Sequence, residues 1–268
     1  MIYVTQVAPY HDGPAGVHGV LGQSVTAIAQ LAGAGGLDFR HVSDVSHLDV
    51  EELARARVVG LFTIGETPWD HGQRAALLDG LRAGRTGVVA IHAATDSCYG
   101  WDDYGILVGA RFNGHPWTQD FTLEVCDPLH PALAHLGSTW AWHDEVYQFR
   151  DLRPDARVLL RLDESQLDLT RPGVVRQPFG FPLSWCFQER RGRVFSTSLG
   201  HFPAAWESVA FLRYLAGGLS WVLDWSPGAY YGDDHYAHGP GGDAQRSGVR
   251  PVWPGARRGG RGDGVAGW

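Results

Sequence analysis

The sequence contains no lysine, so all 22 of its permanently positive side chains are arginines. They are outnumbered by 29 acidic residues, and the resulting formal net charge of −7 argues against an extended nucleic-acid-binding surface. Cysteine is scarce as well. Cys98, Cys126 and Cys186 are too few and too far apart for a disulfide framework or a zinc finger, so we expect free thiols in a reducing compartment.

Long apolar runs are also missing. No stretch approaches the roughly 20 residues that a membrane-spanning helix needs. The first residues, "MIYVTQVAPYHDG", lack the basic start and the apolar segment of a signal peptide. We therefore expect a cytoplasmic protein with no membrane partner. Its 268 residues are 44% hydrophobic and 12% aromatic, which is enough for a sizeable core.

The first half of the chain alternates between strand-like and helix-like segments. Short apolar runs bounded by glycine or polar residues predict strands, and apolar residues at helical spacing predict helices. Ser46 and the acids after it resemble a capped helix start. This rhythm predicts a parallel sheet with helices on both faces. The predicted strands are 1–7, 37–42, 57–64 and 86–91, and the predicted helices are 20–36, 46–56 and 70–84.

The pattern changes after residue 110. Additional shorter strands are predicted there, followed by a last helix over about 203–223. Residues 226–268 are rich in glycine, proline and arginine without any periodicity, which is typical of a disordered tail. We therefore expect one α/β domain over 1–225 and a tail over 226–268. The additional strands are 120–127, 144–149, 156–164, 182–187 and 192–199.

The segment "VVAIHAATDSCYG" (88–100) is the most informative one, because an apolar strand ends abruptly at His92. In open α/β sheets, ligands bind beyond the carboxyl ends of the strands. We expect His92, Asp96, Glu145 and His201 to be catalytic. Further candidates for binding a substrate follow other predicted strands or lie in later segments: His18, Glu66, Trp117, Asp144 and Trp185.

Two chemical roles for the histidines stay open. His92, His115 and His201, with Asp144 or Glu145, would make a nitrogen and oxygen site for zinc, manganese or iron. Alternatively, an imidazole would act as general acid or base, since its pKa lies near neutrality, with Asp96 orienting His92. Structural interpretations compete with both: His92 could be packed at a strand end, Trp117 and Trp185 could belong to the core, and the segment from His130 to Pro131 could be a plain turn.

Several segments together resemble one family. "GVVAIHAATDS", "LVGARFNGHP", "HDEVYQF", "PLSW" and "GRVFSTSLGH" occur in the order and approximate spacing of the trehalose-utilisation (ThuA-like) family, over about residues 1–223. The resemblance implies the fold of class I glutamine amidotransferases, with a flavodoxin-like, mostly parallel sheet. Those enzymes carry a nucleophilic cysteine at the turn where this chain has His92. Ser196 is a departure, because the family usually has an aromatic residue there. We expect this change to reshape the pocket wall, so the resemblance does not extend to trehalose itself as the substrate.

The resemblance also implies carbohydrate metabolism, often beside oxidoreductases that make 3-keto sugars. We therefore expect an enzyme that acts on a sugar or keto-sugar glycoside by elimination, hydrolysis or isomerisation, with a small carbohydrate as its partner. One alternative is a sugar-binding accessory protein without catalysis. Another is an amidotransferase-like hydrolase that uses Cys98, which we disfavour because Cys98 lies six residues beyond the turn. The sequence leaves open whether the chain forms a homodimer.

Overall fold

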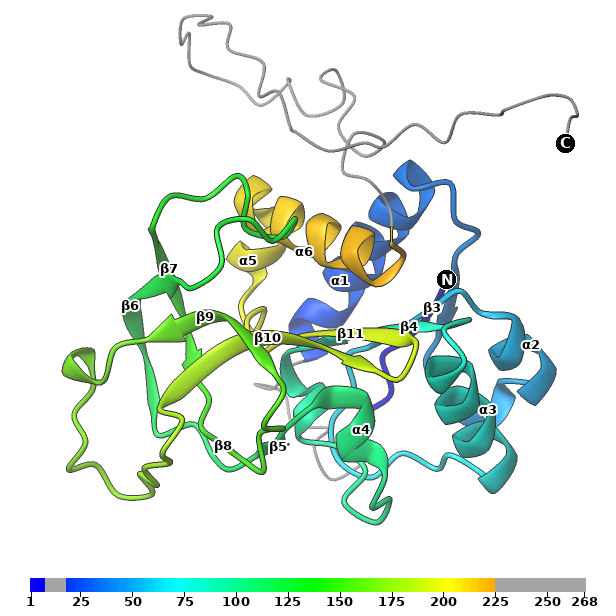
Figure 1. Ribbon diagram of the computed structural model, residues 1–268, viewed down its shortest axis with the longest axis horizontal. Coiled ribbons are helices and arrows are strands. Elements are labelled where there is room, and N and C mark those ends of the chain that lie inside the picture. The colour runs from blue at the N-terminus through cyan, green and yellow to red at the C-terminus, as the bar shows by residue number, and fades with distance from the viewer. Residues whose placement is uncertain (8–17, 225–268) are drawn as a thin grey trace, which may run out of the picture. The chain divides into compact units, whose positions relative to one another are not determined.

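The apolar runs of the sequence form one large mixed β-sheet (Figure 1). The computed structural model describes residues 1–7 and 18–224, and within them the sheet has nine strands in the order β2-β1-β3-β4-β11-β10-β9-β6-β7. Neighbouring strands from β2 to β11 are parallel, and those from β11 to β7 are antiparallel. The strands are β1 (Ile2–Val4), β2 (Arg40–Val42), β3 (Val58–Leu61), β4 (Gly87–Ile91), β6 (Trp117–Val125), β7 (Thr139–Val146), β9 (Arg157–Leu162), β10 (Phe181–Glu189) and β11 (Gly192–Thr197).

Helices cover both faces of the sheet, as the sequence predicts (Figure 1). On one face lie α1 (His18–Ala34), α5 (Pro203–Glu207) and α6 (Val209–Val222). On the other face lie α3 (His71–Arg82) and α4 (Tyr104–Val108), with α2 (Val50–Arg55) packed beside α3. A small second sheet pairs β5 (Arg111–Phe112) with β8 (Phe149–Arg150). The predicted α/β class and the flavodoxin-like, mostly parallel sheet are confirmed, and the additional strands of the second half extend the same sheet.

Two predicted helices differ in detail from the structure. The segment 46–56 is a short 3₁₀ turn, η2 (Val45–His47), followed by α2. The cap of η2 is the carboxylate of Asp44, which accepts a hydrogen bond from the Ser46 amide, so Ser46 is not the capping residue. The helix predicted over 203–223 is broken at Ser208, whose hydroxyl caps α6 by accepting from the Phe211 amide.

Close packing of α6 depends on Gly217. A Cβ atom at this position would lie 2.4 Å from the carbonyl oxygen of Pro131 and 2.5 Å from the backbone of Ala132. Only glycine permits this approach, which lets α6 lie against the turn at residues 130–132. The same turn packs under the last part of α6, where the rings of His130 and Trp221 are 5.4 Å apart.

The strand register brings several loop residues together at the carboxyl ends of the strands. Ile91 of β4 pairs with Thr197 of β11, so the residues that follow, His92 and Ser198, lie side by side. Strand β7 runs at the outer edge of the sheet. Within the described residues, no helix is long and apolar enough to cross a membrane. The tail predicted over 226–268 lies outside the described residues, as does the side chain of His18, whose backbone begins α1.

Candidate functional site

His92 occupies a sharp turn between β4 and the 3₁₀ helix η3 (His92–Thr95). Its φ of +50° lies in the left-handed region, which costs a non-glycine residue about 1–3 kcal/mol and is typical of strand-to-helix elbows that present a functional side chain. The ring is fully buried, and its Nδ1 lies 2.8 Å from the carbonyl oxygen of Ser198. Because a carbonyl oxygen only accepts, Nδ1 carries the proton and Nε2 presents a lone pair.

Three side chains surround Nε2 of His92. Nδ1 of His201 lies 3.1 Å away, the Tyr147 hydroxyl 3.3 Å and Oε2 of Glu145 3.7 Å. The same oxygen of Glu145 lies 3.3 Å from Nδ1 of His201. We call His92, Glu145 and His201 the strand-end cluster. Its members come from the ends of β4, β7 and β11, which are far apart in the sequence but meet at one edge of the fold.

Asp144 holds this arrangement in place from the opposite face of β7. Its buried carboxylate accepts hydrogen bonds from the indole of Trp142 and from the backbone amides of Glu145, Gly200 and His201, at 2.8–3.3 Å. These bonds fix the loop that carries His201. The prediction that Asp144 binds substrate is therefore wrong, because its side chain is buried and its oxygens are already engaged.

Burial shifts the pKa of each group in the strand-end cluster. It lowers the pKa of His92 and of His201 to about 4 each, so both rings are neutral at pH 7. Burial, together with the nearby charge of Asp144, raises the pKa of Glu145 to about 7. Glu145 and His201 keep 13% and 18% of their side chains exposed, so the cluster opens to solvent on their side.

His115 forms the outer rim of the site. Its Nδ1 lies 3.6 Å from Oε1 of Glu145, and its ring stacks on Tyr147 with centroids 5.6 Å apart. Burial lowers the pKa of His115, and the negative charge of Asp96 opposes that shift. Asp96 accepts a hydrogen bond from the hydroxyl of Tyr99. The carbonyl of Ser198, rather than Asp96, orients His92.

This geometry can be set against known proteins. A family model described as ThuA, trehalose utilisation, matches residues 10–222. The chain belongs to the ThuA family. A comparison with curated proteins gives no match.

Solved structures agree with the ThuA assignment at the level of fold. The chain is similar to a ThuA-like protein from Bacteroides uniformis, with 20% identity and a TM-score of 0.68, covering 85% of this chain and 94% of the other. A ThuA-like protein from Parabacteroides merdae gives 18% identity and a TM-score of 0.63, covering 83% and 89%. A cytoplasmic protein from Salmonella typhimurium gives 11% identity and a TM-score of 0.55, covering 82% and 98%.

Not every residue predicted from the ThuA resemblance and the strand ends reaches the site. Trp117 and Trp185 are 1% and 0% exposed, and their indoles donate to the carbonyls of Asp168 and Val108, so neither offers a face to a sugar. Ser196 is also fully buried and donates to Val108. The expectation that it reshapes the pocket wall is therefore wrong, because it packs in the core beside Trp185.

Glu66 lies in the neighbouring loop after β3. It is exposed, and its Oε1 accepts a hydrogen bond from the backbone amide of Gly100, which ties that loop to the loop after β4. Glu66 therefore supports the loops around the site.

Cys98 is buried in the loop after η3, and its sulfur lies 3.0 Å from the hydroxyl of Thr67. Burial raises the pKa of its thiol, which disfavours the thiolate that a nucleophile requires. The turn that would carry the nucleophile of an amidotransferase is occupied by His92 instead.

Two residues of the site were missed from the sequence. Tyr147 contacts His92 and His115, and the backbone carbonyl of Ser198 fixes the proton of His92. Tyr147 falls within the quoted segment "HDEVYQF", two residues after Glu145, so alternation along β7 could have placed both on one face. The strand-end cluster has Glu145 as its third member, and the predicted metal ligand His115 lies outside the cluster.

Proposed function

We propose that this ThuA protein is an enzyme of carbohydrate metabolism that transfers protons on a keto-sugar glycoside at the strand-end cluster. The observation that carries the proposal is the convergence of two neutral imidazoles, a carboxylate and a phenol at one edge of the sheet. Such groups with strongly shifted pKa values in an open site are typical of catalysis. The membership of the trehalose-utilisation family supports a carbohydrate as the substrate.

The reaction that fits these groups is elimination from a 3-keto glycoside. A ketone at C3 acidifies the hydrogen at C2, so that a base can remove it and leave an enolate. The electron pair then forms the C1–C2 double bond, the bond from C1 to its oxygen substituent breaks, and the leaving oxygen takes up a proton. Isomerisation of a keto sugar begins with the same proton transfer and needs the same groups.

His115 is the base that the geometry favours. Its ring is 43% exposed at the mouth of the site, and the Glu145 carboxylate facing Nδ1 would orient it and stabilise it once protonated. The charge of Asp96 acts in the same sense. The enolate oxygen needs a proton donor or a cation, and the inner pair of His92 and His201 is where either would be supplied.

Two competing functions are less well supported. A sugar-binding accessory protein would present tryptophan faces to its ligand, and the two candidates, Trp117 and Trp185, are buried. A thiol-dependent hydrolase would need Cys98 beside a histidine, whereas its sulfur lies against the hydroxyl of Thr67. We further propose a cytoplasmic location, which suits the free thiols of Cys98 and Cys186.

The test is turnover of synthetic 3-keto glycosides that carry a chromogenic leaving group. We expect His115→Gln to lower kcat by about 10²–10⁴-fold, the usual contribution of a general base. Substitution of His143, an exposed imidazole on β7 that pairs with Asp120, is the matched control and should leave kcat unchanged. Full turnover by His115→Gln would contradict the proposed role of His115, and binding without turnover by the wild type would favour the accessory protein.

A further inference from the structure

The three ligand-type atoms of the strand-end cluster form a compact triangle. Its sides are the 3.1 Å between His92 Nε2 and His201 Nδ1, the 3.3 Å between His201 Nδ1 and Glu145 Oε2, and the 3.7 Å between His92 Nε2 and Glu145 Oε2. A point equidistant from three atoms at these separations lies about 2.0 Å from each, which is the length of a bond from zinc to nitrogen or oxygen.

Each of these three groups is also held from behind. The Ser198 carbonyl accepts the Nδ1 proton of His92 and so leaves Nε2 as a ligand atom. Asp144 binds the backbone amide of His201. The second oxygen of Glu145 faces His115, which leaves Oε2 for the centre of the triangle. Supports of this kind, which here fix the tautomer of His92, the loop that carries His201 and the orientation of Glu145, are characteristic of metal sites.

We propose that His92, Glu145 and His201 bind one divalent transition-metal ion. The inference concerns the same site as the proposed function, but it rests on geometry alone. Two imidazoles with one carboxylate suit zinc, manganese or iron, whereas magnesium and calcium prefer all-oxygen sites. His92 is fully buried while Glu145 and His201 are partly exposed, so one side of the ion stays open to water or substrate, as in catalytic sites.

A metal ion at this position would polarise the carbonyl of a keto sugar as a Lewis acid. His115, outside the triangle, would remain available as the base. Glu145 then has two roles for its two oxygens: Oε2 belongs to the metal site and Oε1 orients His115.

The test is metal binding by the untagged full-length protein after dialysis against a chelator. Calorimetric titration with Zn²⁺ should give one tight site, and Co²⁺ should give the visible absorption of a four- or five-coordinate ion. Mg²⁺ should not bind. Glu145→Gln and His201→Ala should each weaken Zn²⁺ binding by at least about 100-fold, because each removes a direct ligand.

Two controls make the result specific to this site. Replacement of the exposed His143 by alanine should leave the affinity unchanged, and so should replacement of His235 and His238, the histidines beyond residue 224. Equal Zn²⁺ affinity in wild type and in both ligand variants would overturn the proposal, as would the lack of a site in the wild type. Metal binding without turnover would leave this inference standing and refute the proposed function, whereas turnover by a wild-type protein that binds no Zn²⁺ would refute the inference and leave the proposed function standing.

Discussion

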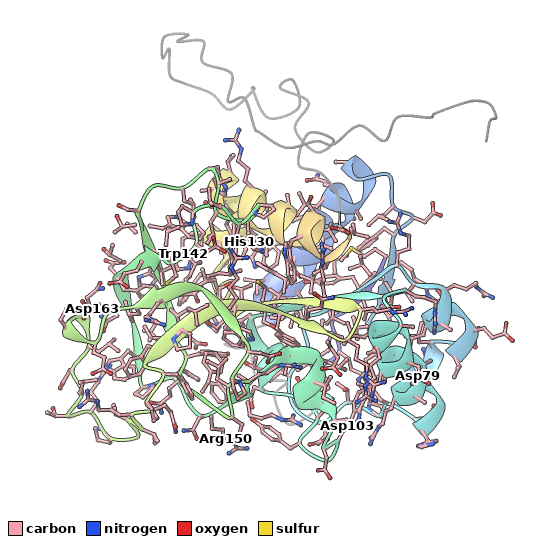
Figure 2. All side chains as sticks on the ribbon, in the orientation of Figure 1. Asp79, Asp103, His130, Trp142, Arg150 and Asp163 are labelled. Carbon is pink, nitrogen blue, oxygen red and sulfur yellow. The ribbon has the colours of Figure 1, made fainter. Side chains whose placement is uncertain are left out.

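The described residues contain two regions in which a histidine is buried, and these regions differ in what surrounds the ring. In the strand-end cluster, both nitrogens of His92 face partners from β7 and from the loop after β11. In the turn at residues 130–132, which lies on the α6 side of the sheet (Figure 2), Nδ1 of His130 accepts from the Ala132 amide. Nε2 of His130 has no hydrogen-bond partner among the described residues.

Both regions lower the pKa of their histidine by burial, to about 4 for His92 and about 3 for His130. Burial and a shifted pKa therefore do not identify a functional site by themselves. His130 is surrounded by the rings of Phe195 and Trp221, and its role is structural. What distinguishes the strand-end cluster is the convergence of several polar groups around one point that is open to solvent.

The largest effect is expected from Asp144→Asn, which leaves the outline of the side chain intact. In this variant an amide nitrogen, which cannot accept a hydrogen bond, takes the place of one carboxylate oxygen. Some of the four N–H groups that donate to Asp144 would therefore lose their buried, charged acceptor. We expect a loss of about 2–3 kcal/mol in the free energy of unfolding, with weaker metal binding as the His201 loop relaxes. Urea unfolding measures the first effect. Asp120→Asn, on an exposed side chain, is the control, and equal stability of the two variants would contradict this account.

A second substitution tests the packing of the other region. In Gly217→Ala, the new methyl group meets the backbone of residues 131 and 132, so we expect destabilisation by about 1–3 kcal/mol. Gly22→Ala in α1 meets nothing within 4 Å and should instead stabilise by up to about 1 kcal/mol. Thermal unfolding of both variants provides the comparison. A neutral Gly217→Ala would mean that α6 does not rest tightly on this turn.

A third prediction concerns pH. The pKa of His130 is about 3 in the folded state and near its ordinary value of 6.5 in the unfolded chain. Between these values the unfolded state binds the extra proton, so this residue makes stability fall as the pH drops from 6.5 towards 3. His130→Asn keeps an acceptor for the Ala132 amide. It should reduce the slope of the unfolding free energy against pH by the equivalent of up to about one bound proton. Urea unfolding of wild type and variant from pH 6.5 down to about pH 4 measures this pH dependence. An unchanged slope in the variant would rule out His130 as the source of the pH dependence.

The smallest effect is expected from Tyr147→Phe. The hydroxyl contributes one long hydrogen bond of 3.3 Å to His92, while the ring that stacks on His115 remains. Loss of one such bond corresponds to about 0.5–1.5 kcal/mol, so we expect about a 3–10-fold lower kcat and a loss in unfolding free energy of no more than about 1.5 kcal/mol. Steady-state kinetics on a 3-keto glycoside would detect it. A loss of several hundredfold would instead assign Tyr147 a direct part in proton transfer.

The sequence predicts the first half of the fold well because parallel strands are buried on both faces and appear as continuous apolar runs. It also places His92 correctly, since a strand that ends at a polar residue is a local signal. Asp144 and Glu145 are adjacent in sequence, and the sequence could not assign their different roles. Strand alternation puts them on opposite faces of β7, and only the strand pairing decides which face meets His92. Burial of Trp117 and Trp185 likewise depends on packing from distant segments.

The central claim is that proton transfer on a keto sugar takes place at the strand-end cluster together with His115 on its rim. The most direct measurement is exchange of the C2 hydrogen of a 3-keto glucoside in D₂O, followed by proton NMR, because exchange reports proton removal whether elimination or isomerisation follows. We predict rapid exchange with the wild type and with the His143→Ala control, and exchange near the uncatalysed rate with His115→Gln and Glu145→Gln. Equal exchange in wild type and both site variants, or none with the wild type, would contradict the claim.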